Sequence, residues 1–251
     1  MSMSTESTTP GAPPRSSPPE LVAEGLELGY GDRRVVRELS LRVPTGRVTA
    51  TIGPNGCGKS TLLRGFSRLL RPSAGTVTLG GRPLGSFGAR EFARTVGLLP
   101  QQPVAPDGIT VADLVSRGRY PHQGLFSRAS AQDDAAVAWA LAATRTGELA
   151  ERPVAELSGG QRQRVWIAMA LAQQTDILLL DEPTTFLDVS HQIEVLDLLT
   201  DLNAQRGTTI VMVLHDINLA ARYADHLFAL QAQAGRGVRG PVCTATGQRA
   251  G

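Results

Sequence analysis

The stretch Gly53-Pro-Asn-Gly-Cys-Gly-Lys-Ser60 follows a run rich in β-branched residues, Arg47-Val-Thr-Ala-Thr-Ile52, and precedes an apolar segment that begins Thr61-Leu-Leu. A strand, a glycine-rich loop and a helix in this order are typical of a phosphate-binding loop. The glycines allow successive backbone N–H groups to face an anion, which also meets the N-terminus of the following helix. We therefore expect Lys59 to reach the phosphates and Ser60 to bind Mg²⁺.

The composition predicts a globular protein without a nucleic-acid partner. The chain has 251 residues, of which 41% are hydrophobic and 19% charged, enough for one large core or two modest lobes. A net charge of +2 is too small at this length to indicate nucleic-acid binding. Two cysteines suit a reducing compartment, and no apolar run reaches the roughly 18 residues that span a bilayer. We expect a chain that is neither exported nor membrane-spanning by itself.

The N-terminal part divides into a tail and a β-rich region. Residues 1–20 are rich in Pro, Ser and Thr, so we predict that they are disordered. From Leu21 the apolar residues alternate between turn signals, which predicts antiparallel strands, with a hairpin at Val77-Thr-Leu79. Tyr30 lies in this region, where its ring either stacks on adenine or serves only as a turn residue.

Residues 103–155 form a segment of different character. Proline and glycine punctuate it as far as Gly124, and an alanine-rich stretch, residues 131–149, favours a helix. We interpret the segment as a small helical insertion, extending over about 103–165 when the following helix start is included.

Polar residues stand at the carboxyl ends of three predicted core strands. Gln101 follows residues 95–99, Asp181 and Glu182 follow the apolar run 177–180, and His215 follows residues 209–214. Because the ends of parallel strands meet at one edge of an open α/β sheet, these side chains are expected beside the phosphate loop. Buried carboxylates need a cation or a catalytic reason, so Asp181 suits Mg²⁺ and Glu182 suits a base.

A second glycine-rich motif, Leu157-Ser-Gly-Gly-Gln161, precedes a predicted helix and forms a second anion site. Together with the phosphate loop, this motif resembles the nucleotide-binding subunit of an ATP-binding-cassette (ABC) transporter. The resemblance extends over about residues 21–230 and includes a D-loop at residues 186–188. It implies an α/β fold: a P-loop NTPase core with a mostly parallel sheet flanked by helices, an antiparallel β subdomain and a small helical subdomain.

The resemblance also implies a role for each motif residue. ATP would contact Tyr30, Gly53, Pro54, Asn55, Gly56, Cys57, Gly58, Lys59, Ser60 and Thr61. Mg²⁺ would be held by Ser60, Gln101 and Asp181, and hydrolysis would depend on Glu182, His215, Lys59 and Gln101. Two copies would enclose two ATP molecules, with each signature, Ser158, Gly159, Gly160 and Gln161, acting on the partner's ATP.

Two further stretches narrow the resemblance. Residues 118–123 and 183–192 resemble those of ATPases that drive import of ferric siderophores, haem or vitamin B12. The implied partners are a second copy, transmembrane permease subunits and, indirectly, a substrate-binding protein, at the cytoplasmic face of the membrane. The permease is expected to contact the surface around Gln101 and residues 104–126. Arg119 is expected to be a docking charge there, whose reversal reduces transport and permease co-purification but leaves the basal ATPase activity near normal.

Two alternatives remain at this point. One is a soluble ABC ATPase that acts in DNA repair, chromosome organisation or translation, although such relatives carry long coiled coils or two cassettes, and this chain has no heptad run. The other is a degenerate cassette that only binds nucleotide, which the presence of Lys59, Asp181, Glu182 and His215 disfavours. Beyond Leu230 the resemblance stops, and residues 231–251, rich in glycine and without an acidic residue, are predicted to be unstructured.

Overall fold

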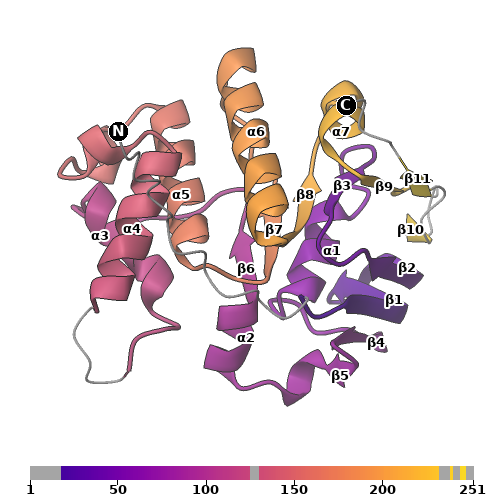
Figure 1. Ribbon diagram of the computed structural model, residues 1–251. Coiled ribbons are helices and arrows are strands. Elements are labelled where there is room, and N and C mark those ends of the chain that lie inside the picture. Colours follow the sequence, from indigo (N-terminus) through magenta and orange to yellow (C-terminus); the bar gives the residue numbers. More distant parts are fainter. Residues whose placement is uncertain (1–17, 125–129, 232–237, 240–243, 247–251) are drawn as a thin grey trace, which may run out of the picture.

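The computed structural model describes residues 18–124, 130–231, 238–239 and 244–246. Its centre is a sheet of parallel strands that carries an antiparallel strand, β11, at one edge (Figure 1). Buried β-branched and leucine residues form the central strands, as expected when both faces of a sheet are covered. In spatial order the strands are β11 (Thr244–Thr246), β9 (His226–Ala229), β3 (Val48–Ile52), β8 (Thr209–Val213), β7 (Ile177–Asp181) and β6 (Val96–Leu99).

A second sheet contains the predicted antiparallel strands. β1 pairs with β2 along most of its length, and β4 and β5 form the expected hairpin across Gly80 and Gly81. In Figure 1 this sheet lies apart from the helical region, on the other side of the central sheet. Its order is β10 (Val238–Arg239), β2 (Arg33–Val43), β1 (Leu21–Tyr30), β4 (Ala74–Leu79) and β5 (Arg82–Pro83).

Helix α1 (Lys59–Phe66) joins the two sheets. Leu62, Leu63 and Phe66 are fully buried in a cluster that includes residues from the antiparallel sheet and from one face of the central sheet. The helix approaches β1 closely, because a Cβ atom at Gly65 would lie only 2.7 Å from Leu28 Cδ1. The helix that follows the phosphate loop is therefore held rigidly between both layers.

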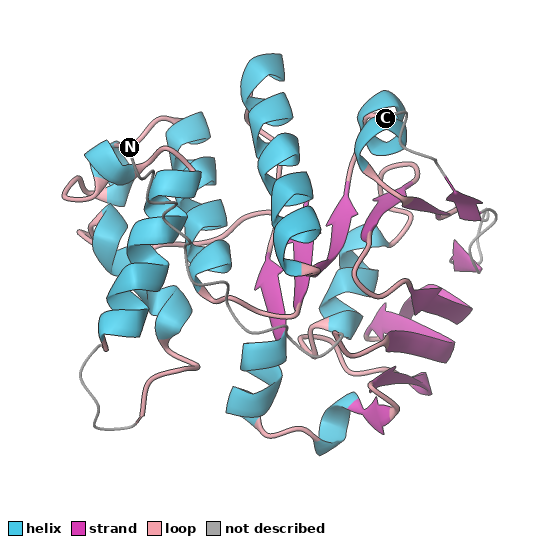
Figure 2. Ribbon diagram, viewed as in Figure 1, coloured by secondary structure: helices cyan, strands magenta, loops and turns pink. Residues whose placement is uncertain are grey.

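Helices cover the other face of the central sheet, and some of them form a helical region beside it; Figure 2 draws all the helices in cyan. In that region α4 packs on α5, and α3 packs on both. The predicted helix over 131–149 is shorter, since it ends at Ala143 and a 3₁₀ turn follows at Gly147–Leu149. Besides α1, the helices of the described residues are α2 (Ala89–Thr95), α3 (Val111–Ser116), α4 (Ala131–Ala143), α5 (Gly159–Ala172), α6 (Val189–Arg206) and α7 (Ile217–Tyr223), with further 3₁₀ turns at Leu84–Ser86, Arg117–Arg119 and Val154–Glu156.

The prediction that Arg119 is a docking charge is wrong. Its side chain is buried within the helical region, with only 2% of the residue exposed. The guanidinium donates to Asp133 Oδ1 at 2.9 Å, to the Ala172 carbonyl at 2.7 Å and to Gln174 Oε1 at 3.2 Å. Arg119 therefore holds three segments of the helical region together instead of presenting a charge to a partner.

The structure describes only a few residues of the two predicted tails. The first strand begins at Leu21, where the sequence pattern changes, whereas residues 1–17 of the predicted tail lie outside the described part. In the C-terminal tail, β10 pairs with β2 and β11 with β9, so those five residues are not unstructured. Within the described ranges, no helix combines the length and apolar character that crossing a bilayer requires.

Candidate functional site

The phosphate loop has the backbone geometry that its glycines predict. Gly58 caps α1 with φ 99°, and Gly53 has φ 148°. A Cβ atom at Gly53 would lie 2.4 Å from the Leu230 carbonyl oxygen, so only glycine fits there. Lys59 Nζ donates to the carbonyl oxygens of Gly53 and Pro54, at 2.7 and 3.1 Å. Its ammonium group thus lies across the loop, where phosphates would be bound.

The loop opens into a cavity of about 570 Å³ that brings together most of the predicted nucleotide residues. Gln101, and not its neighbour Gln102, lines this cavity, together with Glu182 and His215 from two other strand ends. Gly53, Pro54 and Cys57 do not line it, and Cys57 is buried in the core below the loop. The lining residues are Tyr30, Arg33, Val35, Asn55, Gly56, Gly58, Lys59, Ser60, Thr61, Gln101, Glu182 and His215.

Ser60 and Asp181 form a pair of oxygen donors at the base of the loop. The Ser60 hydroxyl donates to Asp181 Oδ1 at 2.9 Å, and Asp181 is buried. Burial raises the pKa of Asp181, although the hydrogen bond from Ser60 opposes that effect. A buried carboxylate beside a hydroxyl suits Mg²⁺, which proteins commonly bind through one or two such groups plus substrate phosphates.

Glu182 has both carboxylate oxygens engaged and an unusual backbone. His215 Nε2 lies 2.7 Å from Glu182 Oε1, and the Thr185 hydroxyl donates to Oε2 at 3.0 Å. Burial acts to raise the pKa of Glu182, but hydrogen bonds from His215, Gln101 and Thr185 outweigh it and lower that pKa. The residue has φ 55°, a left-handed backbone conformation that a non-glycine side chain disfavours. An ionised carboxylate that lines the cavity beside the phosphate loop can accept a proton from water.

Tyr30 lies at the open side of the cavity, and two neighbours that sequence reasoning missed lie beside it. Arg33 and Val35, on β2, also line the cavity. They reach it because the β1–β2 register pairs Tyr30 with Arg33. Arg64, one turn into α1, donates to the Tyr30 hydroxyl at 2.9 Å. Arg33 and Val35 belong to no motif, so only the pairing of β1 with β2 could have revealed them.

The signature residues do not contribute to this cavity. Ser158 caps α5 by accepting from the backbone N–H of Gln161 at 3.2 Å, and Gln161 Oε1 accepts from the Ser158 N–H at 3.1 Å. Ser158 and Gly159 are exposed, and no residue of the motif lines the nucleotide cavity. Within one chain, the two predicted anion sites are therefore separate.

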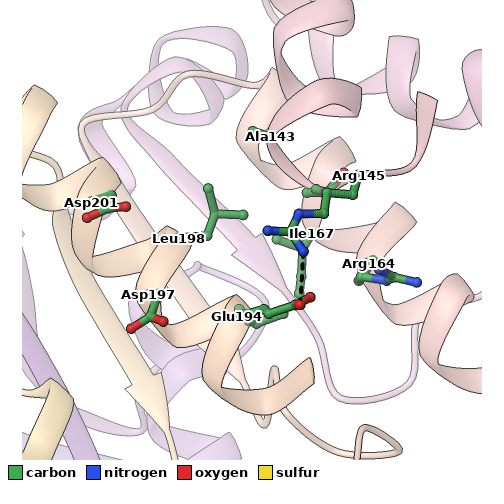
Figure 3. A pocket seen from close by; sticks show the side chains of 10 residues that line it. Ala143, Arg145, Arg164, Ile167, Glu194, Asp197, Leu198 and Asp201 are labelled. Carbon is green, nitrogen blue, oxygen red and sulfur yellow. Dashed lines mark hydrogen bonds and ion pairs between the residues drawn. The ribbon is translucent and has the colours of Figure 1, made fainter. Parts of the chain in front are cut away.

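Another cavity, of about 240 Å³, lies where residues of α5 face residues of α6 (Figure 3). It is lined by Arg145, Arg164, Glu194, Asp197 and Asp201 among others, and Arg145 forms an ion pair with Glu194 at 2.9 Å. It shares no lining residue with the nucleotide cavity, and it contains none of the predicted site residues.

Comparison with known families agrees with this geometry. The family model described as ABC transporter matches residues 36–185, which include the phosphate loop, the signature, Asp181 and Glu182. The chain belongs to the ABC transporter family.

Two relatives and one solved structure illustrate how similar this ABC transporter chain is to known members. It is 56% identical over 208 residues to the probable siderophore transport system ATP-binding protein YusV of Bacillus subtilis, covering 83% of this chain and 76% of that protein. It is 55% identical over 211 residues to the ferric enterobactin transport ATP-binding protein FepC of Escherichia coli, covering 84% and 78%. A dimeric structure of a bacterial ABC transporter cassette matches with a TM-score of 0.79 at 26% identity, covering 91% and 99%.

Proposed function

We propose that this chain is the ATP-hydrolysing subunit of an importer that takes up ferric siderophores, the substrate class in the names of its relatives. The observation that carries the proposal is the cavity in which the phosphate loop, Gln101, Glu182 and His215 meet. The relatives' names support the substrate class, whereas the cavity with its phosphate loop supports the nucleotide. Haem and cobalamin are the remaining substrates that the sequence resemblance suggested.

The geometry supports hydrolysis with distinct roles for the site residues. Lys59 and backbone N–H groups among residues 55–61 would bind the phosphates, and the Tyr30 ring would stack on adenine. Ser60 and Asp181 would hold Mg²⁺ with Gln101 near them, and the bound ion would offset negative charge on the phosphates. Glu182 would orient the attacking water and accept its proton, while His215 would contact the γ-phosphate.

The separation of the signature from the cavity supports a homodimer. Ser158, Gly159, Gly160 and Gln161 would contact ATP held by the second copy, so each complete site would contain residues from both chains. The matched bacterial cassette structure is dimeric, in line with this arrangement. A monomer would then bind ATP but hydrolyse it poorly, because the γ-phosphate would lack the hydrogen-bond donors of the partner's signature.

The chain would act at the cytoplasmic face of the membrane, docked on permease subunits that receive siderophore from a substrate-binding protein. The permease would contact the surface around Gln101 and residues 104–126, of which 125 and 126 lie outside the described residues. Val104 and Tyr120 are exposed there by 88% and 58%, and they replace Arg119 as contact residues. Exposed aromatic side chains such as Tyr120 are enriched at protein interfaces.

A deletion strain tests the proposal. Deleting the gene is expected to abolish uptake of radiolabelled iron from at least one ferric siderophore, and the wild-type gene is expected to restore it. A copy with Asp181→Asn is the matched control and is expected not to restore uptake, because it removes a charge from the Mg²⁺ site and leaves the cavity lining intact. Normal uptake of siderophore iron, haem and cobalamin in the deletion strain would contradict the importer function.

A further inference from the structure

A buried glutamine connects the signature helix to the turn that carries Glu182. Gln163 lies near the start of α5, is 6% exposed, and donates through Nε2 to the Pro183 carbonyl oxygen at 2.9 Å. A buried amide is retained only where it has a hydrogen-bond partner, because its desolvation is otherwise unfavourable. Pro183 directly follows Glu182, so the contact acts on the segment that positions the proposed base.

The turn from Glu182 to Thr185 is held by its own hydrogen bonds as well. Thr185 N–H donates to the Glu182 carbonyl oxygen at 3.2 Å, and the Thr185 hydroxyl donates to Glu182 Oε2 at 3.0 Å. Glu182 has φ 55°, a conformation that a non-glycine residue keeps only when its surroundings enforce it. Gln163 fixes the carbonyl in the middle of this turn, and Thr185 fixes the carboxylate.

We propose that Gln163 and Thr185 are positioning residues for hydrolysis, acting through Glu182. Gln163 sets the path of the backbone after the strand β7, and Thr185 holds one carboxylate oxygen so that the other faces the cavity beside His215. The inference rests on the proposed function, in which Glu182 is the base. Since Gln163 belongs to the helix that begins with the signature, the same bond ties the signature of each subunit to the base of that subunit's own ATP site.

The first test compares two glutamines of the same helix region. Gln163→Met keeps the length of the side chain and removes its donor. The matched control is Gln173→Met, because Gln173 Nε2 donates to the Ala93 carbonyl at 2.6 Å beyond the other end of α5. Gln163→Met is expected to lower kcat for ATP about tenfold, equivalent to about 1.4 kcal/mol, with KM changed by less than about twofold. The control is expected to keep kcat within about twofold.

The second test uses the half-buried Thr185, where substitution does not open the core. Thr185→Val keeps the shape and removes the hydroxyl, whereas Thr185→Ser keeps the hydroxyl. The valine variant is expected to lose about tenfold in kcat with unchanged ATP affinity, and the serine variant to retain wild-type kcat within about twofold. This pair remains informative if Gln163→Met does not fold.

Two results would overturn the inference. One is equal kcat in Gln163→Met and Gln173→Met, and the other is equal kcat in the valine and serine variants of Thr185. In both tests, kcat of each variant is compared with kcat of the full-length wild-type protein. If the wild type itself does not hydrolyse ATP, the proposed function fails; if it does and these variants match it, only the positioning roles fail.

Discussion

Replacing Arg119 with methionine tests how the helical region is held together. Arg119→Met keeps most of the aliphatic volume and removes the hydrogen bonds to Asp133, Ala172 and Gln174. Removing one partner of a buried ion pair destabilises a protein by about 3–5 kcal/mol. Asp133 keeps its bonds from the Ser130 N–H and hydroxyl, at 3.0 and 2.9 Å, so we expect the lower end, about 3 kcal/mol.

Thermal unfolding measures this loss. At about 2–4 °C per kcal/mol for a chain of this size class, Arg119→Met is expected to lower Tm by about 6–12 °C. The control is Arg145→Met, whose ion pair with Glu194 is also 2.9 Å long but lies at the surface, with side chains 73% and 41% exposed. Such a pair contributes about 0–1 kcal/mol. Similar Tm values for the two variants would refute the structural role of Arg119.

The ion pair between Arg119 and Asp133 predicts that stability depends on pH. The Ser130 N–H and the Arg119 guanidinium lower the pKa of Asp133 below 3.8, against the opposite effect of burial. A lowered carboxyl pKa stabilises the fold fully above the unfolded-state pKa, and the contribution is lost as pH falls through the folded-state pKa. The Tm difference between wild type and Asp133→Asn is therefore expected to narrow as the pH is lowered below 3.8. A constant difference between neutral and acidic pH would contradict this assignment.

Three further substitutions test the site and its partners. Glu182→Gln is expected to keep ATP binding and to lower kcat by about 10²-fold or more, since a positioned base contributes about that factor; turnover like that of the wild type would remove Glu182 as the base. Ser158→Arg is expected to abolish hydrolysis while monomer ATP binding persists, and ATP-driven dimerisation of the Ser158→Arg, Glu182→Gln double variant, measured by size-exclusion chromatography, would contradict the enclosed-ATP model. Val104→Asp is expected to reduce both transport and co-purification with the permease, while the isolated subunit keeps its ATPase activity. Normal transport by this variant would refute docking at that surface.

Much of the fold was predictable because its signals are local. Alternating apolar residues predicted the antiparallel sheet, and the apolar runs before Asp181 and His215 predicted buried strands. The phosphate loop was predictable because left-handed backbone conformations and close approaches demand glycine at fixed spacings. The cavity that joins Gln101, Glu182 and His215 followed from the rule that parallel strands present their carboxyl ends at one edge.

The sequence pattern failed where a residue depends on distant partners. The position of Arg119 in a segment punctuated by proline and glycine favours a surface charge, but its partners lie in α4, at the last residue of α5 and just beyond that helix. The tail after Leu230 has the composition of an unstructured segment, yet β10 and β11 add to the edges of the two sheets. In both cases backbone or side-chain hydrogen bonds to remote segments outweigh the local tendency.

The sequence alone was enough to predict the central buried strands, the antiparallel strands after Leu21, the phosphate loop and the strand ends that carry Asp181 and Glu182. These features rest on residue spacing and backbone conformation, which neighbouring residues control. Only the tertiary structure decided that Thr185 and His215 hold the two oxygens of Glu182, and that Gln163 donates to Pro183 twenty residues away. The Gln163 bond exists because packing brings the signature helix against the turn after β7, and the His215 contact exists because β8 pairs with β7, so that their carboxyl ends lie side by side.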